Sequence, residues 1–322
     1  MRTYLDCIPC VMQQALRAGR MATSDEAKLK LILDKTGALI KTISMETIPA
    51  ATGAKVYHIV SEITGVKDPY KEIKQQHIRE TKAIYPELER IVANADDKLL
   101  TAIKIAIAGN IIDLGVNKAF DIVTDVKTIL SQDFGIFDYP AFKKQLDQSK
   151  NVLYIGDNVG ESVFDKILIK ELKRPVKYAV RAIPIINDVT WEDAVASGID
   201  QVATIVDSGC KSPGVIPEES SPAFGELFDT ADLVISKGQG NFEGLSGCNR
   251  QVFFLLKAKC SIIAHHLGVK EGAIILKEHY TKKLSKKIFF ITRSEAIAAP
   301  VCRLPHSPCP VLFTDVVRLK FI

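Results

Sequence analysis

The sequence lacks several features that would assign it to a specialised class of protein. No run of about eighteen or more apolar residues occurs in its 322 residues, so a membrane-spanning helix is not expected. The first residues, MRTYLDCIPCVMQ, lack the continuous apolar core of a signal peptide. The net charge is only +4, and lysine and arginine form no long stripe interleaved with aromatics. We therefore expect a cytoplasmic protein with neither a membrane nor a nucleic acid as its partner.

Cysteine is present, but not in a pattern typical of a disulfide framework. Seven cysteines, an odd number, are scattered along the chain. Cys7 and Cys10 form one C-x-x-C pair, whereas a structural zinc site usually needs four cysteine or histidine ligands. The spacing of Cys210, Cys248 and Cys260 does not indicate that they complete such a set. We interpret Cys7 and Cys10 as two buried thiols on the first helix, in preference to a metal or redox role.

Several familiar catalytic and cofactor motifs are also absent. The chain has no H-E-x-x-H, no nearby Cys-His pair, no Walker A loop and no clean G-x-G-x-x-G. A nucleophilic serine or cysteine has no base at a recognisable spacing. His265 and His266 resemble surface residues in the last turn of a helix. An oxygen-ligated metal is therefore a better candidate than a nucleophile or a nicotinamide cofactor.

The composition is ordinary for a soluble globular enzyme, with 47% apolar and 25% charged residues. The length predicts a large core and two domains. We expect a helical domain over 1–120, an α/β domain over 121–277 and an atypical basic tail over 278–322. The role of the tail stays open, and the sequence does not predict an oligomeric state.

The first part of the chain has helical periodicity without strands, which indicates a helix bundle. Ser24 is a candidate N-cap for a long helix, and Pro49 and Gly65 delimit the next one. Pro86 is expected to open another short helix. Asp96-Asp97 introduce a strongly apolar helix from Leu99 to Leu114.

From Asn151 onward, short apolar runs alternate with helical segments. A connector over 116–150, holding one short helix from Phe142 to Gln148, precedes them. Continuous apolarity fits strands that helices cover on both faces, and strand–helix alternation favours a parallel, doubly wound sheet. The candidate strands are Val152–Ile155, Tyr178–Ile183, Val202–Val206, Leu233–Ile235, Val252–Leu256 and Ala273–Leu276.

Acid and amide side chains follow two successive strands of this predicted sheet. Asp157-Asn158 come directly after the first strand, and Asn187-Asp188 follow the second. Ligands of open parallel sheets bind at the carboxyl ends of the strands, and carboxylate and amide oxygens suit a hard divalent cation. Each aspartate alone could be a helix N-cap. Two such pairs after successive strands favour a cation site.

Two further loops fall at the same predicted edge. Asp207-Ser208-Gly209 alone is an ordinary turn. The loop 236–243, SKGQGNFE, combines glycines that let a ligand approach the backbone with Lys237, a charge suited to phosphate. In the apolar helix before the connector, Asn110 and Asp113 share a face. They either cap the helix end or close over the cleft of the second domain.

Together these motifs resemble the damage-control phosphatase family, long filed as a domain of unknown function. The resemblance lies in GDN-x-GE at 156–161, ND-V-T at 187–190, D-S-G at 207–209 and SKGQGNFE at 236–243. The C-x-x-C followed by Gln13, and Gly109-Asn110 with Asp113, are similar to the archaeal and bacterial branch. The match extends from residue 1 to about Lys277.

The resemblance implies an N-terminal helical domain and a C-terminal three-layer α/β/α domain with a mainly parallel, Rossmann-like sheet. It also implies a metal-dependent phosphatase for phosphate monoesters of small metabolites, either sugar phosphates or damaged phosphometabolites. The metal would be manganese, nickel, cobalt or magnesium, held by Asp157, Asn158 and Asp188. Lys237 and its neighbouring glycines would bind phosphate, and Asn110 and Asp113 would line the substrate side.

The expected site residues form two groups. The expected catalytic residues are Asp157, Asn158, Asp188 and Lys237. The expected substrate-binding residues are Asn110, Asp113, Glu161, Asn187, Asp207, Ser208, Gly238, Gly240, Asn241 and Glu243. The general base stays open among Glu161, Asp193 and Asp207. The alternatives are an S-adenosylmethionine-dependent carboxyl methyltransferase and a non-catalytic metal- or metabolite-binding protein, for which Cys7 and Cys10 could hold a structural zinc.

Overall fold

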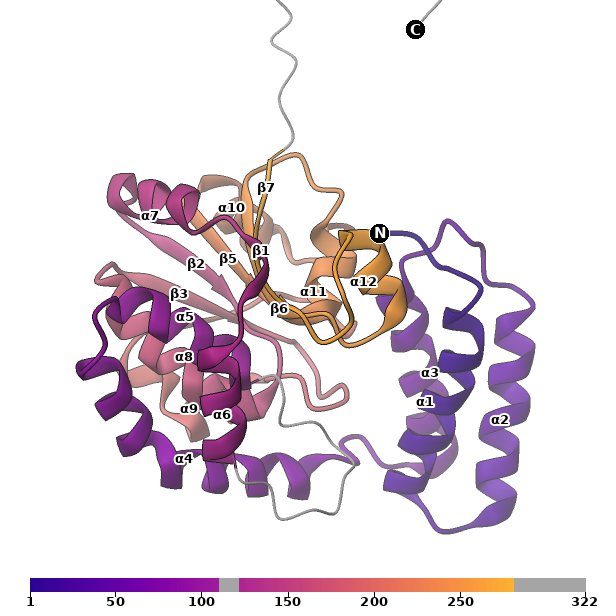
Figure 1. Ribbon diagram of the computed structural model, residues 1–322. Helices are drawn as coiled ribbons and strands as arrows, with labels where there is room; N and C mark the ends of the chain where they lie inside the picture. The colour runs from indigo at the N-terminus through magenta and orange to yellow at the C-terminus, as the bar shows by residue number, and fades with distance from the viewer. Residues whose placement is uncertain (110–121, 281–322) are drawn as a thin grey trace, which may run out of the picture. The chain divides into compact units, whose positions relative to one another are not determined.

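The computed structural model describes residues 1–109 and 122–280 of the chain. These residues belong to one compact unit, Met1–Lys282, with a mixed α/β fold (Figure 1). Asn110 and Asp113, and nearly all of the tail 278–322, lie outside the described residues.

The described strands form a single sheet. Their bounds are β1 Phe134–Phe137, β2 Val152–Ile155, β3 Val176–Val180, β4 Thr204–Asp207, β5 Leu233–Lys237, β6 Val252–Lys257 and β7 Ile274–His279. The strand order is β1-β7-β6-β5-β2-β3-β4, and only the β6–β7 pair is antiparallel. From β2 the chain adds strands outward to one side, and from β5 to the other. The β2–β5 boundary is therefore the switch point where doubly wound sheets bind ligands.

Helices cover both faces of the sheet and form a separate group beside it (Figure 1). Their bounds are α1 Cys7–Ala22, α2 Glu26–Ile40, α3 Pro49–Thr64, α4 Lys71–Ala93, α5 Lys98–Ala108, α6 Ile122–Ser131, α7 Tyr139–Gln148, α8 Val159–Leu172, α9 Trp191–Ser197, α10 Pro222–Thr230, α11 Gly238–Leu245 and α12 Ser261–Leu267. Within the described ranges, short 3₁₀ helices span Ile199–Gln201 and Pro217–Glu219.

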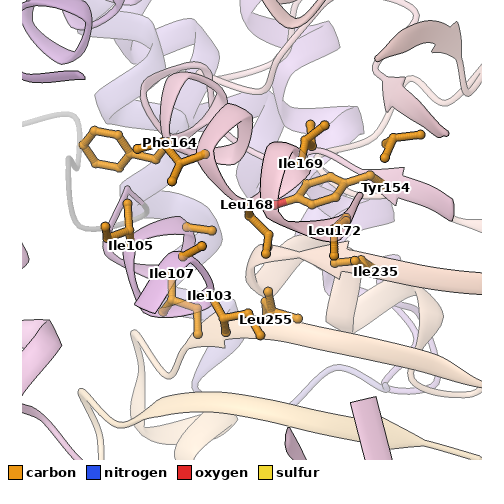
Figure 2. Packing of buried hydrophobic residues seen from close by; sticks show 14 of the residues in the cluster. Ile103, Ile105, Ile107, Tyr154, Phe164, Leu168, Ile169, Leu172, Ile235 and Leu255 are labelled. Atoms are coloured by element: carbon orange, nitrogen blue, oxygen red, sulfur yellow. The ribbon is translucent and has the colours of Figure 1, made fainter. Parts of the chain in front are cut away.

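The alternation of side chains along the strands divides the core into two layers. Tyr154 and Ile235 belong to the cluster that includes α5 and α8, as Figure 2 shows. Their neighbours Leu153 and Val234 belong to the opposite cluster, with residues of α10, α11 and α12. Because successive strand residues point to opposite faces, a continuous apolar run such as Val152–Ile155 serves both layers. The predicted α/β class with a mainly parallel sheet is confirmed.

The N-terminal helices divide between two packing groups. Helices α1, α2 and α3 enclose their own small core, which includes Ala15, Ile32 and Val56. Helices α4 and α5 instead pack against α8 on the face of the sheet. The sequence periodicity cannot reveal this, because both groups present an apolar stripe of the same kind. The division into three domains stays a prediction.

The sequence signals predicted some helix ends correctly and others wrongly. Pro49 begins α3, Gly65 ends it with φ of 76°, and the Asp97 side chain caps α5. Ser24 is not the cap of α2, because Asp25 accepts the hydrogen bonds from Ala27 and Lys28. Pro86 does not open a new helix, since α4 continues through it. The buried residues of α4 on both sides of this proline pack in the same cluster as α8, and this packing outweighs the local penalty.

Six predicted strands are present, with ends that shift by a few residues, but the predicted connector was wrong. It contains α6 and the strand β1 as well as the short helix, α7. β1 is a four-residue edge strand with alternating half-buried and exposed side chains, and its pairing with β7 is irregular. Such a short strand gives little periodic signal. In the described ranges, no helix is long and apolar enough to cross a membrane.

Truncating a leucine in the middle of α8 tests the packing. Leu168 is fully buried, whereas Leu31 on α2 is 45% exposed. We expect Leu168→Ala to lower the free energy of unfolding by about 2–5 kcal/mol, because it leaves a cavity in the core. Leu31→Ala makes the same chemical change on a helix surface and should alter that free energy by less than about 0.5 kcal/mol. Urea titrations of the two variants check this, and equal losses would contradict the assigned core.

Candidate active site

The loops after β2 and β3 lie directly against each other. The backbone N–H of Val159 donates to the carbonyl of Asn187, and that of Val189 donates to the carbonyl of Asp157, both at 2.8 Å. Asn158 and Asp188 form an isolated antiparallel bridge. The acid–amide pairs Asp157-Asn158 and Asn187-Asp188 are therefore brought together by main-chain bonds, as their position after neighbouring parallel strands predicts.

A buried arginine ties the second loop to the glycine-rich loop after β5. Arg181, only 1% exposed, donates from Nε to Asp188 Oδ2 and from Nη2 to Asn241 Oδ1, each at 2.8 Å. Asn241 Oδ1 also accepts from the Val215 N–H, and its Nδ2 donates to the carbonyls of Gly156 and Lys237. Both donors and the acceptor of the Asn241 amide are thus used within the protein. Substrate binding by Asn241 stays a prediction.

The first turn after β5 passes so close to Asp157 that only glycine fits there. Gly238 has φ of 77°, in the left-handed region that favours glycine. A Cβ added to Gly238 would overlap the carboxylate of Asp157, beside which Asn158 Nδ2 donates to Oδ2 at 3.1 Å. The glycine at this position is required by the close approach of backbone and carboxylate. The missing side chain lets the start of the loop after β5 lie directly against the loop after β2.

The two aspartates are buried close enough to repel each other. Burial raises the pKa of Asp188 to about 7, with Arg181 opposing the shift and Asp157 adding to it. Burial also raises the pKa of Asp157, while Arg181 and Lys259 act in the opposite direction. Two carboxylates in this setting favour a proton or a further cation between them.

These aspartates lie in the wall of a cavity of about 380 Å³, which we call the edge cavity. Asn158 and Asn187 line it beside them, and Gly240 and Glu243 line it from α11. The other walls come from α1, α3 and the start of α12. Its volume is at the small end of the range for metabolite sites. The positively charged side chains in the wall are Arg17 of α1 and Lys259, which follows β6.

A second cavity, of about 1070 Å³, lies against α3 and the segment from Ile183 to Ile186. It is larger, but none of the site residues expected from the sequence lines it. Tyr57 and Ile186 line both cavities. We place the candidate active site in the edge cavity because the acid–amide pairs line it there.

Lys237 points away from the edge cavity into a buried polar cluster. Its Nζ donates to Asp165 Oδ1 at 2.7 Å and to the Ala106 carbonyl at 2.8 Å, and it lies 3.5 Å from Glu161. Burial lowers the pKa of Lys237, but Asp165 and Glu161 outweigh this and the net shift is upward. Asp165 also accepts from the hydroxyls of Tyr154 and Tyr178. Lys237 thus balances buried acids beneath the site, and its contact with phosphate stays a prediction.

The remaining expected residues are spread around the site. Glu161 is fully buried, and among the described residues neither carboxylate oxygen has a hydrogen-bond partner. Asp207 is exposed and accepts from the Gly209 N–H, and Ser208 is buried and donates to the Val180 carbonyl. Asp193 closes the capping box of α9 and pairs with Lys74. Asp193, Asp207 and Ser208 do not line the edge cavity.

The donor set fits a hard divalent cation. Asp157, Asn158 and Asp188 offer carboxylate and amide oxygens, and the raised pKa values indicate that added positive charge would be stabilised there. The ranges that the structure describes hold no cluster of three or more His, Cys, Asp or Glu residues suited to a metal. Two carboxylates and one amide fill only part of the coordination shell of such a cation. A metal held by them would take water or substrate oxygens in its other positions.

Sequence reasoning missed three charged residues of the site: Arg17, Arg181 and Lys259. Arg181 falls inside the predicted strand Tyr178–Ile183 and looked like part of it. Lys259 comes two residues after β6, at the same edge as the other loops, so the argument from strand ends could have found it. Arg17 lies on α1, far away in the sequence, and no local pattern marks it.

The fold and the site define an α/β protein with an acid- and amide-lined cavity at the carboxyl edge of a mainly parallel sheet. Residues 3–275 match the damage-control phosphatase ARMT1-like domain, and the chain belongs to that family.

Two similar proteins carry a family name. A damage-control phosphatase of Pyrococcus horikoshii is 34% identical over 282 residues, which cover 85% of this chain and 97% of that protein. A damage-control phosphatase of Archaeoglobus fulgidus is 32% identical, with 84% of this chain and 97% of that protein covered. The crystal structure of a DUF89 family protein from Pyrococcus horikoshii aligns with a TM-score of 0.81 at 32% identity, covering 87% of this chain and 99% of that one.

The pH dependence of stability tests the environment of Glu243. Burial raises the pKa of this carboxyl to about 7 from an ordinary value of 4.5, while the hydrogen bond from Gln239 lowers it. Between these pH values the folded state holds a proton that the unfolded state has lost. The free energy of unfolding should therefore fall as the pH rises through this window.

In protein stripped of metal, we expect Glu243→Gln to remove this component. The free energy of unfolding of the variant, relative to the unchanged protein, should rise by on the order of 2–3 kcal/mol between pH 4.5 and 8. Urea titrations at a series of pH values measure the difference. Parallel curves for the two proteins would show that the Glu243 carboxyl is not perturbed.

Proposed function

We propose that this protein is a metal-dependent phosphatase that hydrolyses phosphate monoesters of small metabolites, such as sugar phosphates or damaged phosphometabolites. Membership of the damage-control phosphatase family supports the phosphatase role. One observation carries the proposal furthest: Asp157 and Asp188 lie together in the wall of a small cavity that also presents Arg17 and Lys259. Metal-assisted phosphate chemistry requires carboxylates that bind the metal cation and positively charged side chains that bind the phosphate anion.

The proposed metal ligands are Asp157, Asn158 and Asp188. Arg181 holds Asp188 from behind through a bond of 2.8 Å, so the carboxylate keeps one orientation without the metal. Gly238 keeps the space beside Asp157 free of a side chain. A divalent cation bound there, manganese, nickel, cobalt or magnesium, would withdraw charge from the phosphoryl oxygens and acidify a nearby water.

Lys259 and Arg17 are the proposed partners of the substrate phosphate. Both line the edge cavity, and the charge of Lys259 acts to lower the pKa of Asp157. Lys237, whose Nζ already donates to Asp165 and to the Ala106 carbonyl, acts from beneath as a counter-charge. The small cavity volume favours a compact monoester over a large polymeric substrate.

Glu243 is the proposed proton donor to the leaving alcohol. Its carboxyl lines the edge cavity, and its pKa of about 7 keeps it substantially protonated near neutral pH. An acid of this strength can release a proton to an alkoxide oxygen as the phosphate ester bond breaks. Gln239 donates to Glu243 Oε1 at 3.2 Å and orients the carboxyl.

An activity panel tests the proposed reaction. Protein stripped with a chelator and resupplied with Mn²⁺, Co²⁺, Ni²⁺ or Mg²⁺ should hydrolyse at least one phosphate monoester, and chelated protein should hydrolyse none. Asp157→Asn keeps the shape of the side chain but removes its charge. It should lower kcat/KM by about 100-fold or more and weaken metal binding measured by calorimetry. The proposal fails if no ester is hydrolysed with any metal, or if Asp157→Asn retains full activity.

A second substitution tests the assignment of the phosphate contact. Lys259→Met removes a charge at the edge cavity and should lower kcat/KM by roughly 10- to 100-fold, because a hydrogen bond to a charged group is worth about 1.5–3 kcal/mol. Lys270→Met is the matched control, since Lys270 is exposed and does not line the cavity. The control should leave the kinetics unchanged. Equal kinetics for the two variants would exclude Lys259 from the site.

A further inference from the structure

Three thiols line the edge cavity and have no part in the proposed hydrolysis. Cys7 and Cys10 lie in the first turn of α1, and Cys260 immediately precedes α12. They come from opposite ends of the described chain and meet in the wall that also holds Asp157 and Asp188. Cys210 and Cys248 do not line this cavity.

The two thiols of α1 differ in accessibility. Cys10 is exposed and its Sγ accepts from Gln14 Nε2 at 3.4 Å, whereas Cys7 is half-buried. Burial raises the pKa of the Cys7 thiol, and the neighbouring Cys10 and Cys260 sulfurs raise it further. The interpretation from the sequence, two buried thiols, is therefore wrong for Cys10. The outer thiol can meet a reagent from solution, and the inner one lies next to it.

A metal staple is the weaker use of these thiols. A structural zinc site needs four ligands, and the described residues contain no group of three or more His, Cys, Asp or Glu placed for a metal. A dithiol pair needs only Cys7 and Cys10. Residues three apart on a helix have Cβ atoms about 5–6 Å apart, and a disulfide needs about 3.5–4.5 Å. A small adjustment of one helical turn therefore suffices to join them.

We propose that Cys7 and Cys10 form a redox-active dithiol in the wall of the edge cavity, and that its oxidation by a small-molecule disulfide restricts access of substrate to the cavity. The effect on substrate rests on the proposed phosphatase function. The dithiol chemistry itself does not depend on that function.

The chemistry is two successive thiol–disulfide exchanges. The exposed Cys10 loses its proton, and its thiolate attacks one sulfur of the oxidant, which breaks the oxidant's S–S bond and releases one thiolate. Cys7 then loses its proton and attacks the Cys10 sulfur, forming the Cys7–Cys10 bond and releasing the second thiolate. The two protons neutralise the two released thiolates. The protein is oxidised by two electrons and the disulfide reagent is reduced to two thiols.

Oxidation would affect the cavity because the first turn of α1 is part of its wall. Asp6, Cys7 and Cys10 all line the edge cavity. The preceding N-terminal ammonium of Met1 donates to the Glu243 carbonyl at 2.7 Å. Tightening this turn therefore moves residues that line the cavity.

Redox titration of the full chain tests the dithiol without reference to activity. The protein is equilibrated in buffers of reduced and oxidised glutathione, alkylated, and digested with trypsin. The peptide Thr3–Arg17 contains Cys7 and Cys10 and no other cysteine. In oxidising buffer we expect this peptide to lose two hydrogen atoms in mass and to escape alkylation, and dithiothreitol should reverse both changes. Full alkylation of both thiols in oxidising buffer, or pairing of either thiol with another cysteine, overturns the proposal.

Kinetics of the same samples test the effect on the cavity. Oxidised protein should show at least a tenfold lower kcat/KM than reduced protein, and Cys10→Ser should give equal values in the two buffers. Cys248→Ser, outside the cavity, should keep the full response. A bridged protein with unchanged kcat/KM overturns the gating claim. Absence of activity in both buffers counts against the proposed phosphatase, while the mass of the peptide still decides the dithiol.

Discussion

The constraint on which the site depends is the proximity of two buried carboxylates. Asp157 and Asp188 are almost fully buried, and main-chain hydrogen bonds between their loops hold them in place. Burial and mutual repulsion both disfavour the charged forms of these carboxyls, so placing them together costs free energy of folding. A proton or nearby positive charge relieves this repulsion. Several surrounding side chains supply positive charge.

Positive charge reaches Asp157 from Arg181, Lys259 and, more weakly, Lys237. Arg181 lies behind Asp188 and extends to Asn241, which in turn fixes the loops after β2 and β5. Lys237 lies in a separate buried cluster with Asp165, whose other partners are two tyrosine hydroxyls. These residues are held in place by hydrogen bonds to other protein groups. A preorganised site of this kind avoids reorganisation when the substrate arrives.

The sequence alone could predict the edge of the sheet but not everything that surrounds it. Apolar runs such as Val152–Ile155 mark central strands, and the acid–amide pairs after them mark the site, because both signals are local. β1 was missed, since a short, half-exposed edge strand has little periodicity. The buried environment of Lys237 and the role of Arg181 were missed for another reason. Lys237 bonds to Ala106 and Arg181 bonds to Asn241, and tertiary packing, not spacing in the sequence, brings these partners together.

The edge cavity has two walls that come from different parts of the fold. The carboxyl edge of the sheet provides the acids and Lys259, while α1 and α3 provide the facing wall, with Arg17 and Tyr57 among its residues. One polar link between the N-terminal segment and the rest of the protein is the Met1 ammonium, which donates to the Glu243 carbonyl and to Ser246. If the proposed function holds, substitutions in α1 and α3 would change which ester fits, because Asp157 and Asp188 belong to the other wall. The same wall carries Cys7 and Cys10, so a change in their oxidation state would act on substrate entry and leave the carboxylates in place.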